Sequence, residues 1–458
     1  MSATENSAAL AEIVDLTHKG QAVAKLESGK VIFLDRGLPG ERARIAINSK
    51  SRRYNRGRVL ELVELSPDRR DPDCRHFDIC GGCAWRDLDY PAQLRFKRKQ
   101  VIDSLERIGK LVDAPVDEIV PAEPLNFYRN KMEFSFNRNP ETPAGFNLGL
   151  HERGRYSRVF DVHDCLLQSP RSNAIIAWVR EFAQRQGLPA YDVQEHTGYL
   201  RFLMIREGKR TGELMINLVT TTETLSCAEA FVSECRERFP EVTTIVQNMN
   251  DRRSNIAYGD REEILYGPGY IHEEILDRRF RVYANSFLQT NSYQTETLYR
   301  LALERAELRP TDRLFDLYCG AGTIGICAAS QVAEVVGIEL EASAIQAALE
   351  NAELNGVSNA CFLSGGVRET LRERRDELRS ADVMIIDPPR AGMHPRAIYH
   401  ASRFQARRIV YVSCSPPAFA RDAALFAEQG YQLRRVIPVD MFPHTVHTEL
   451  VAVFEPVS

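Results

Sequence analysis

The chain has 458 residues, of which 44% are hydrophobic and 27% are charged, and its formal net charge is −4. This balance is typical of a globular protein, and at about 150 residues per domain the length predicts about three domains. No apolar run reaches the roughly 18 residues that a membrane span needs, and the start of the sequence lacks a secretory signal pattern. We therefore expect a cytoplasmic protein with reduced cysteines, no membrane partner and no evident obligate protein partner.

Residues 1–66 carry short β-rich runs that are separated by glycine. The runs are 22–24, 30–34, 42–47 and 58–63. Closely spaced strands with turn signals predict a small β-barrel. A basic run, Lys50-Ser51-Arg52-Arg53-Tyr54-Asn55-Arg56-Gly57-Arg58, follows the third of these strands. Taken alone, such a run is typical of a solvated loop or strand edge.

The middle region, 67–285, begins with a polar linker that contains proline and then mixes helical and strand patterns. Apolar residues recur at helical spacing over 92–110, whereas 131–136 alternates like a strand. These patterns predict an α+β middle domain. The segment 92–122 is able to pack either on this domain or on the one that follows.

Three cysteines, Cys74, Cys80 and Cys83, are crowded into ten residues. Thiolates this close in a reducing compartment favour a metal site, and Cys165 is the candidate for a fourth ligand. Four thiolates bind either zinc or a [4Fe–4S] cluster, and the spacing does not decide between them. The scattered cysteines are expected to be small buried side chains instead. These are Cys227, Cys235, Cys319, Cys327 and Cys361.

The last region, 286–458, alternates apolar strand runs with amphipathic helices. The strand runs are 313–317, 335–339, 383–387 and 408–413. This alternation predicts a doubly wound parallel sheet of the α/β class. The first strand leads into the glycine-rich turn 318–325, and Glu339 ends the second strand, where a carboxylate can hold the ribose hydroxyls of an adenosine. NAD also fits this pattern, although the turn lacks the complete Gly-x-Gly-x-x-Gly.

The third strand ends in Asp387-Pro388-Pro389-Arg390, in the crevice at the carboxyl ends of the strands, where ligands bind. Together with Asp316, the glycine-rich turn and Glu339, this motif resembles those of S-adenosylmethionine-dependent methyltransferases. The resemblance implies a class I methyltransferase domain that binds S-adenosyl-L-methionine.

Cys414 follows the fourth strand, so we expect it at the mouth of the crevice. By its position alone it fits a core cysteine at a strand end better than a nucleophile. A thiolate here has a chemical use, however, because carbon 5 of uracil becomes nucleophilic once a thiolate has added to carbon 6. A base must then remove the proton from carbon 5 so that the thiolate can leave.

Two motifs, 413–416 (Ser-Cys-Ser-Pro) and 442–449 (Phe-Pro-His-Thr-Val-His-Thr-Glu), resemble the nucleophile and base motifs of the RNA 5-methyluridine methyltransferase family. The resemblance implies that Cys414 is the nucleophile and Glu449 the base. The segment 285–291 resembles the Phe-x-Gln-x-Asn segment of the same family. Carried over from the family, the contacts to the methyl donor fall on Gln289, Tyr318, Thr323, Glu339 and Asp387.

Two residues depart from the family pattern. Ser415 stands where Asn is usual, and Thr448 stands where Val is usual. Both are small neighbours of the key residues, so we expect them to tune the reaction rather than abolish it.

The pattern Cys-x5-Cys-Gly-Gly-Cys with a distant fourth cysteine is similar to that of the ribosomal branch of the family, whose cysteines hold a [4Fe–4S] cluster. By this resemblance the four cysteines bind [4Fe–4S], with zinc as the alternative. Residues 1–66 resemble a TRAM domain, a small OB-like barrel of RNA-modifying enzymes, so the basic run 50–58 becomes an expected RNA contact. The implied substrate is a uridine of 23S ribosomal RNA. Transfer RNA is the less favoured alternative, since the bacterial tRNA member of the family lacks the barrel and the cysteine cluster.

The expected domains are a TRAM-like barrel over 1–66, a central iron–sulfur and RNA-binding domain over 67–285, and a methyltransferase domain over 286–458. Two other functions stay open. The first is an amino-methyltransferase that acts on nucleic acid, because Asp387-Pro388-Pro389-Arg390 resembles the Asp/Asn-Pro-Pro-aromatic motif of those enzymes. Two observations speak against it: Arg390 stands in the aromatic position, and such enzymes need no thiol. The second is a non-catalytic RNA-binding or ribosome-assembly factor, against which the intact Cys414 and Glu449 speak.

Overall fold

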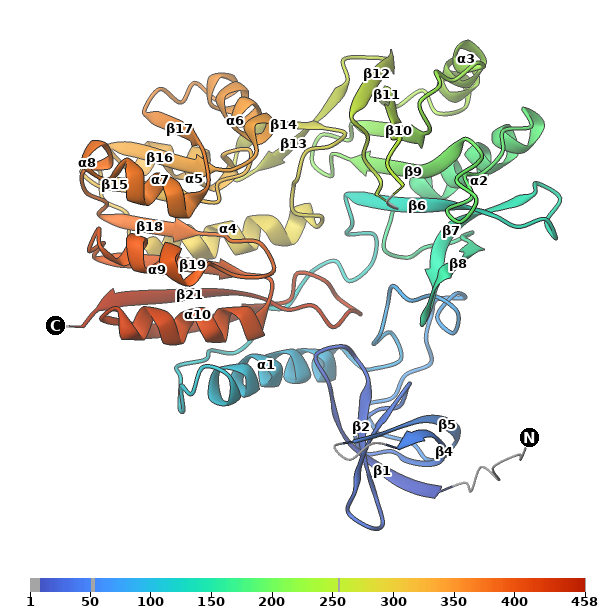
Figure 1. The fold of residues 1–458 in the computed structure, drawn as a ribbon, viewed down its shortest axis with the longest axis horizontal. Helices are drawn as coiled ribbons and strands as arrows, with labels where there is room; N and C mark the ends of the chain where they lie inside the picture. Colours follow the sequence, from blue (N-terminus) through green and yellow to red (C-terminus); the bar gives the residue numbers. More distant parts are fainter. Residues whose placement is uncertain (1–8, 51–53, 254–255, 458) are drawn as a thin grey trace.

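The computed structural model describes residues 9–50, 54–253 and 256–457 (Figure 1). Along the chain, a closed barrel is followed by a linker with one long helix, a seven-stranded sheet, a two-stranded ribbon and a second seven-stranded sheet. The basic run 50–58 is described only in part, since Ser51, Arg52 and Arg53 lie outside these ranges. No helix in the described part of the chain is long and apolar enough to span a membrane.

The N-terminal barrel is closed in the strand order β1-β2-β3-β5-β4. Its strands are β1 (Ala9–Leu16), β2 (Ala22–Leu26), β3 (Val31–Leu34), β4 (Arg42–Lys50) and β5 (Asn55–Glu64). Alternate side chains point inward, so that Ala22, Ala24 and Ile32 are fully buried. At Gly57 a Cβ would lie 2.7 Å from the carbonyl oxygen of Ala46, and only glycine allows this approach of β5 to β4. The closed barrel confirms the barrel predicted for this region.

Helix α1 (Tyr90–Arg107) connects the barrel to the other domains and lies beside α10 (Pro416–Glu428) of the C-terminal domain (Figure 1). Val101 and Leu105 of α1 belong to the same hydrophobic cluster as Phe419 of α10. After the helix, Val116 forms a parallel bridge with Val436. The segment 92–122 thus contacts the C-terminal domain.

The central domain is a sheet in the order β12-β11-β10-β9-β6-β7-β8. Its strands are β6 (Lys131–Arg138), β7 (Phe146–Glu152), β8 (Arg155–Asp161), β9 (Leu200–Glu207), β10 (Leu214–Thr220), β11 (Val242–Met249) and β12 (Arg261–Tyr266). Helices α2 (Pro170–Arg185) and α3 (Ala228–Arg238) pack on it through an aromatic cluster of Trp178, Phe182 and Phe231. A ribbon of β13 (Tyr270–Ile275) and β14 (Arg278–Tyr283) leads to the last domain.

The C-terminal sheet has the order β17-β16-β15-β18-β19-β21-β20, in which the first five strands are parallel and β21 is antiparallel to β19 and β20. The strands are β15 (Arg313–Leu317), β16 (Glu334–Glu339), β17 (Ala360–Ser364), β18 (Val383–Ile386), β19 (Arg408–Ser413), β20 (Tyr431–Val439) and β21 (Glu449–Pro456). The helices are α4 (Ser292–Ala306), α5 (Thr323–Ala328), α6 (Ala342–Leu354), α7 (Val367–Glu373), α8 (Arg375–Leu378), α9 (Pro395–Ser402), α10 and the 3-10 turn Ala329–Gln331. This domain confirms the predicted doubly wound α/β fold.

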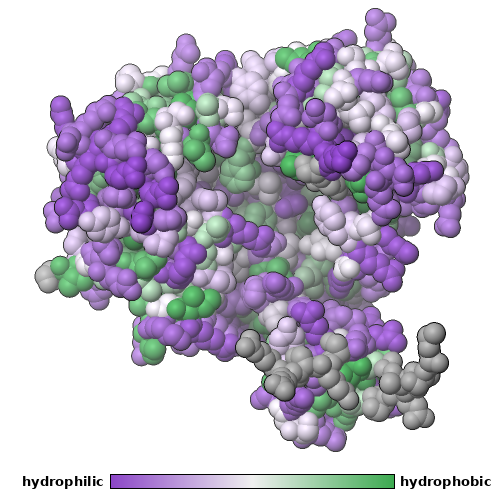
Figure 2. Space-filling view, viewed as in Figure 1, coloured by the Kyte–Doolittle hydropathy of each residue, from purple (hydrophilic) through white to green (hydrophobic). Residues whose placement is uncertain are grey.

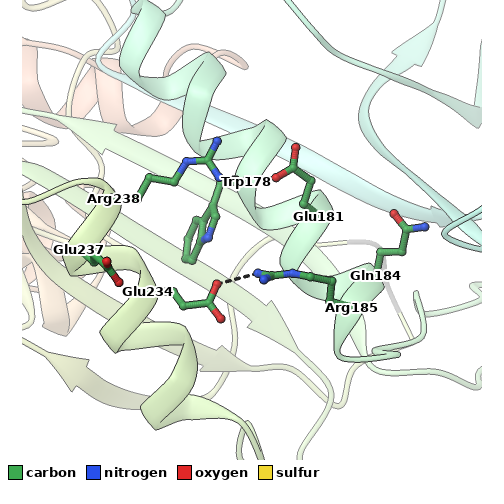
Figure 3. A pocket seen from close by; sticks show the side chains of 7 residues that line it. All are labelled: Trp178, Glu181, Gln184, Arg185, Glu234, Glu237 and Arg238. Carbon is green, nitrogen blue, oxygen red and sulfur yellow. Dashed lines mark hydrogen bonds and ion pairs between the residues drawn. The ribbon is translucent and has the colours of Figure 1, made fainter.

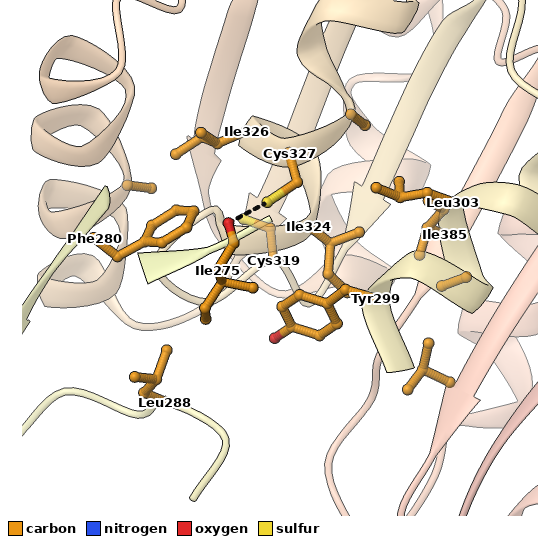
Figure 4. Close-up of a cluster of buried hydrophobic side chains, with 14 of the residues drawn as sticks. Ile275, Phe280, Leu288, Tyr299, Leu303, Cys319, Ile324, Ile326, Cys327 and Ile385 are labelled. Atoms are coloured by element: carbon orange, nitrogen blue, oxygen red, sulfur yellow. Dashed lines mark hydrogen bonds between the residues drawn. The ribbon is translucent and has the colours of Figure 1, made fainter. Parts of the chain in front are cut away.

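One hydrophobic core joins this sheet to the ribbon that precedes it (Figure 4). Ile275 and Phe280 of the ribbon belong to the same buried cluster as Tyr299 of α4. Cys319 and Ile324, which flank the glycine-rich turn, complete it. The packed core therefore fixes the position of the glycine-rich turn before any ligand binds.

Candidate active site

The glycine-rich turn after β15 forms one wall of the crevice at the carboxyl ends of the parallel strands. Gly322 has φ 76°, and a Cβ there would lie 2.9 Å from the ring of Phe362. A Cβ at Gly325 would lie 2.9 Å from the carboxylate of Asp316. Only glycine fits these two positions, which is why the turn was visible as a motif.

The five residues expected to contact the methyl donor all lie around this crevice. Glu339, at the end of β16, accepts a hydrogen bond from the backbone N–H of Gly320 at 3.1 Å. Asp387 follows β18 and is hydrogen-bonded to the side chain of Gln289, while burial and the nearby Asp316 raise its pKa to about 7. Tyr318 directly follows β15, and Thr323 is the first residue of α5.

Asp316 is a further polar residue of this crevice, used in the sequence only to recognise the motif. Its side chain is completely buried. Oδ2 accepts a hydrogen bond from the N–H of Gly325 at 2.8 Å, whereas Oδ1 has no partner in the described structure. Burial and Glu339 raise its pKa to about 7. A buried acceptor without a partner is costly, so Asp316 is suited to receive a donor group from a ligand.

Cys414 and Glu449 lie at the same end of two neighbouring strands. Ser413, the last residue of β19, pairs with Leu450 of the antiparallel strand β21. Cys414 and Glu449 are therefore the next two residues opposite each other, just beyond this pair. Burial, Glu449 and Asp387 raise the pKa of the half-buried Cys414 thiol to about 12. Glu449 is 3% exposed, its Oε2 has no hydrogen-bond partner among the described residues, and burial together with Asp387 raises its pKa to about 8.

Arg390 is the cation of this site. Its positive charge opposes the upward shift in the pKa of both Cys414 and Glu449. Its guanidinium lies 3.2 Å from Nδ1 of the exposed His447, and partial desolvation together with the charge of Arg390 lowers the pKa of this imidazole. Thr448, between His447 and Glu449, is buried with an unpartnered hydroxyl in the described structure.

The 440–448 loop, which leads into Glu449, is hydrogen-bonded to several segments that lie far apart in the chain. Four consecutive carbonyl groups of this loop each accept a hydrogen bond from a different segment. The donors are Asn291 Nδ2 to Met441 (2.8 Å), Lys97 Nζ to Phe442 (2.9 Å), Tyr128 OH to Pro443 (3.0 Å) and the Trp85 N–H to His444 (3.0 Å). The linker, α1, the central domain and α4 therefore share in positioning this loop.

The four clustered cysteines line a single cavity of about 310 Å³. Arg86, Arg129 and His447 line it as well, so it reaches the 440–448 loop. Burial raises the pKa of the Cys80, Cys83 and Cys165 thiols, and the proximity of Cys74 raises all three further. In residues 9–50, 54–253 and 256–457, no three His, Cys, Asp or Glu side chains are arranged to hold one metal ion. The four thiols thus line a shared cavity and are not arranged around the position of a single metal ion.

The remaining cysteines differ in their surroundings. Cys235, Cys319 and Cys327 are buried, as expected. Cys227 is half-buried, and the prediction for Cys361 is wrong, because this residue is exposed. Cys361 lies on β17, the edge strand of its sheet, where one face of the strand is in contact with solvent.

A surface hollow between α2 and α3 contains only residues of the central domain (Figure 3). Four of its charged side chains form two ion pairs. Arg185 lies 2.6 Å from Glu234, and Arg238 lies 3.5 Å from Glu181. These pairs connect the two helices, and none of the candidate catalytic residues reaches this hollow.

The face on which the three domains meet is hollowed at its centre, with polar side chains around the rim (Figure 2). The cavity of the cysteines is lined from the linker, the central domain and the 440–448 loop, and so belongs to this junction.

Comparisons with known proteins agree with this architecture. The family described as tRNA (Uracil-5-)-methyltransferase matches residues 241–455, and the TRAM domain matches residues 3–60. An uncharacterized RNA methyltransferase of Halalkalibacterium halodurans is 39% identical over 443 residues, which cover 97% of this chain and 96% of the relative. Another from Chlorobaculum tepidum is 38% identical over 459 residues, covering 97% and 95% of the two chains.

A solved structure has the same fold over nearly its whole length. The tRNA (uracil-54, C5)-methyltransferase of Pyrococcus abyssi, in complex with S-adenosyl-L-homocysteine, matches with a TM-score of 0.76 and 29% identity. The match covers 97% of this chain and 99% of that one. The barrel, the donor crevice and these relatives together show that the chain belongs to the S-adenosylmethionine-dependent RNA 5-methyluridine methyltransferase family.

Proposed function

We propose that this enzyme methylates carbon 5 of a uridine in 23S ribosomal RNA, with Cys414 as the nucleophile and Glu449 as the base. The observation that carries this proposal is the register of β19 and β21, which brings a thiol and a buried carboxyl group to one end of the donor crevice. An amino-methyltransferase would need neither group.

The chemistry assigns a separate task to each residue. The Cys414 thiolate adds to carbon 6 of uracil, and the displaced π electrons make carbon 5 a nucleophile. S-adenosylmethionine, when bound, supplies the methyl group to carbon 5 and a positive charge that lowers the pKa of nearby carboxyl groups. Glu449 then accepts the proton from carbon 5, the double bond re-forms and the thiolate leaves. Arg390 stabilises the thiolate of Cys414 before it adds to carbon 6 and again as it leaves, since its positive charge lowers the pKa of both Cys414 and Glu449.

The donor would be held by Gln289, Tyr318, Thr323, Glu339 and Asp387, with Asp316 in addition. The pKa values of Asp316 and Asp387 are raised by desolvation, and the proximity of Asp316 raises that of Asp387 further. A cationic ligand relieves this repulsion, so the residues present fit a sulfonium compound better than an anionic one.

The four clustered cysteines are proposed to hold a [4Fe–4S] cluster. Their thiols line one cavity, and a cluster that fills a space fits this arrangement better than a single zinc ion, which needs all four sulfur atoms about 2.3 Å away. The cluster would fix the loop of Cys80 and Cys83 beside the 440–448 loop. Its role is structural, because the proposed reaction needs no electron transfer.

Ribosomal RNA is proposed as the substrate because the cysteine pattern resembles the ribosomal branch of the family, whereas the barrel does not distinguish the two RNAs, since the match to the tRNA enzyme of Pyrococcus abyssi covers 97% of this chain. On the barrel, exposed Arg56 lies over the ring of Tyr54, which packs edge-on against Phe33. Basic and aromatic side chains together suit a single-stranded RNA backbone and its bases. The Pyrococcus abyssi relative acts on tRNA, which makes tRNA the competing substrate in the test.

The test uses 23S ribosomal RNA fragments, and separately tRNA, that carry 5-fluorouridine. Fluorine cannot leave carbon 5 as a proton does, so the covalent protein–RNA adduct persists on a denaturing gel. We expect an adduct with ribosomal fragments that disappears in Cys414→Ala and persists in Cys361→Ala, a control for an exposed thiol.

Three other outcomes would overturn parts of the proposal. An adduct with tRNA alone would show that the substrate is tRNA and not 23S ribosomal RNA. Methyl transfer to ordinary RNA without any adduct would favour the amino-methyltransferase. RNA binding without adduct or transfer would favour a non-catalytic factor.

A further inference from the structure

The barrel touches the loop that carries the proposed base. Val446, three residues before Glu449, packs against the hydrophobic core of the barrel. Its contact there is Gly20, in the turn between β1 and β2, where φ is 78°. A Cβ at Gly20 would lie 2.8 Å from Cγ1 of Val446. The backbone of the barrel turn therefore lies directly against this side chain, with no room for a methyl group between them.

The same barrel turn is fixed to α1. Lys99 of α1 lies 2.7 Å from Asp15, at the end of β1, and Gln100 donates a hydrogen bond to the carbonyl of Thr17 at 3.4 Å. Two residues before Lys99, Lys97 of α1 donates a hydrogen bond to the carbonyl of Phe442 in the 440–448 loop. The barrel turn, α1 and the loop thus form one contact network, in which Val446 is the member nearest to the base.

We propose that Val446 is a positioning residue, through which the barrel sets the place of Glu449. The barrel then acts on the rate of the chemical step and not only on the affinity for RNA. This inference rests on the proposed function, in which Glu449 accepts the proton of carbon 5. Proton transfer requires the two partners within hydrogen-bond reach, and a misplacement of 1 Å can cost about 100-fold in rate.

The barrel offers a matched control for this contact. Gly29 lies in the next turn, between β2 and β3, with φ 75°, and a Cβ there would meet no atom within 4 Å. Alanine at either glycine carries the same cost of about 1 kcal/mol for a left-handed backbone conformation. At Gly20 the added methyl group would push on Val446 and would also lie 3.1 Å from Cβ of Ala84, so the comparison of the two glycines is read together with the Val446 variants, which isolate the Val446 contact.

The experiment measures single-turnover methyl transfer at saturating RNA and S-adenosylmethionine, together with the Kd for RNA. Gly20→Ala should lower the saturating rate about tenfold or more, with the Kd changed by less than about twofold. Gly29→Ala should stay within about twofold of the wild type in both quantities. The double variant Gly20→Ala/Val446→Ala should return to the rate of Val446→Ala alone, because the two atoms that clash are coupled.

The inference is overturned if Gly20→Ala and Gly29→Ala behave alike, or if Gly20→Ala weakens RNA binding at an unchanged saturating rate. If Gly20→Ala does not fold, Val446→Ala in the wild-type barrel decides. A lower rate at unchanged Kd supports the inference, and a wild-type rate overturns it. Absence of methyl transfer in the wild-type enzyme would instead contradict the proposed function.

Discussion

Lys97 Nζ lies 2.5 Å from Oδ1 of Asp440, and both side chains are completely buried. Tyr90 donates a second hydrogen bond to Asp440 at 2.9 Å. Burial lowers the pKa of Lys97, against the opposing effect of the carboxylate. The pair connects α1 with the first residue of the 440–448 loop, so it holds the linker and the catalytic sheet together at the point where the loop begins.

Removing one partner of this pair should be strongly destabilising. Lys97→Met leaves the Asp440 carboxylate buried without its counter-charge, which typically costs about 3–5 kcal/mol. The free energy of unfolding, measured in urea, should fall by that amount. Arg95→Met is the control on the same helix, since its pair with Asp68 is largely exposed and is worth at most about 1 kcal/mol. Equal losses in the two variants would contradict this reading.

The rate of methyl transfer should rise with pH between about 6 and 9. In the proposed mechanism Glu449 reacts as a carboxylate and its pKa is raised to about 8, while Cys414 reacts as a thiolate and its pKa is raised to about 12. Both active forms therefore become more populated as the pH increases. Single-turnover rates across this range check the expectation. A flat or falling profile would show that neither deprotonation limits the reaction.

Glu449→Gln should trap the reaction after methyl transfer. Without a base the proton of carbon 5 stays in place, the double bond cannot re-form, and the thiolate of Cys414 cannot leave. Ordinary RNA, without fluorine, should then give a stable protein–RNA adduct on a denaturing gel. Its absence, together with wild-type turnover, would assign the base to another residue.

Asp316→Asn should stabilise the protein at high pH and weaken donor binding. The pKa of Asp316 is raised to about 7 in the folded state, above the value of about 3.9 expected when unfolded. Its contribution to stability is complete below pH 4 and is lost as the pH rises through 7. The gain of the variant should therefore be larger at pH 8 than at pH 5, on the order of 2 kcal/mol. Unfolding at both pH values and titration with S-adenosylhomocysteine test the two effects.

Cys80→Ala should lower the iron content of protein purified without oxygen and remove the visible absorption of an iron–sulfur cluster. Cys227→Ala, a half-buried cysteine outside the shared cavity, is the control and should retain both. If the wild-type protein contained stoichiometric zinc and no iron, the proposed [4Fe–4S] cluster would be wrong and zinc would be the bound metal.

Much of the C-terminal sheet could be predicted from the sequence, because buried parallel strands are continuous apolar runs. The expected runs 313–317 and 408–413 coincide with β15 and β19. The hairpin of β20 and β21 was not predicted, although Glu449 begins β21. Strand pairing is a non-local property, and nothing within the run 449–456 shows that it lies next to β19.

The central domain was the least predictable part. Only 131–136 was identified as a strand, whereas the sheet has seven strands drawn from residues 131–266. Asp316 was not predicted as one of the residues that contact the methyl donor, because its unpartnered oxygen is a property of the packed structure. The contact of Gly20 with Val446 likewise joins residues far apart in the chain, and no local pattern marks it.

Strand β21 is paired on both sides, with β19 and with β20. Amide hydrogens in such a doubly paired strand are expected to exchange with solvent only when large parts of the domain open. Glu449, the first residue of β21, is therefore anchored on its C-terminal side by a stiff strand. Any displacement of this residue is expected to come from the 440–448 loop that precedes it, so slow motions of α1 and of the barrel turn reach Glu449 only through that loop.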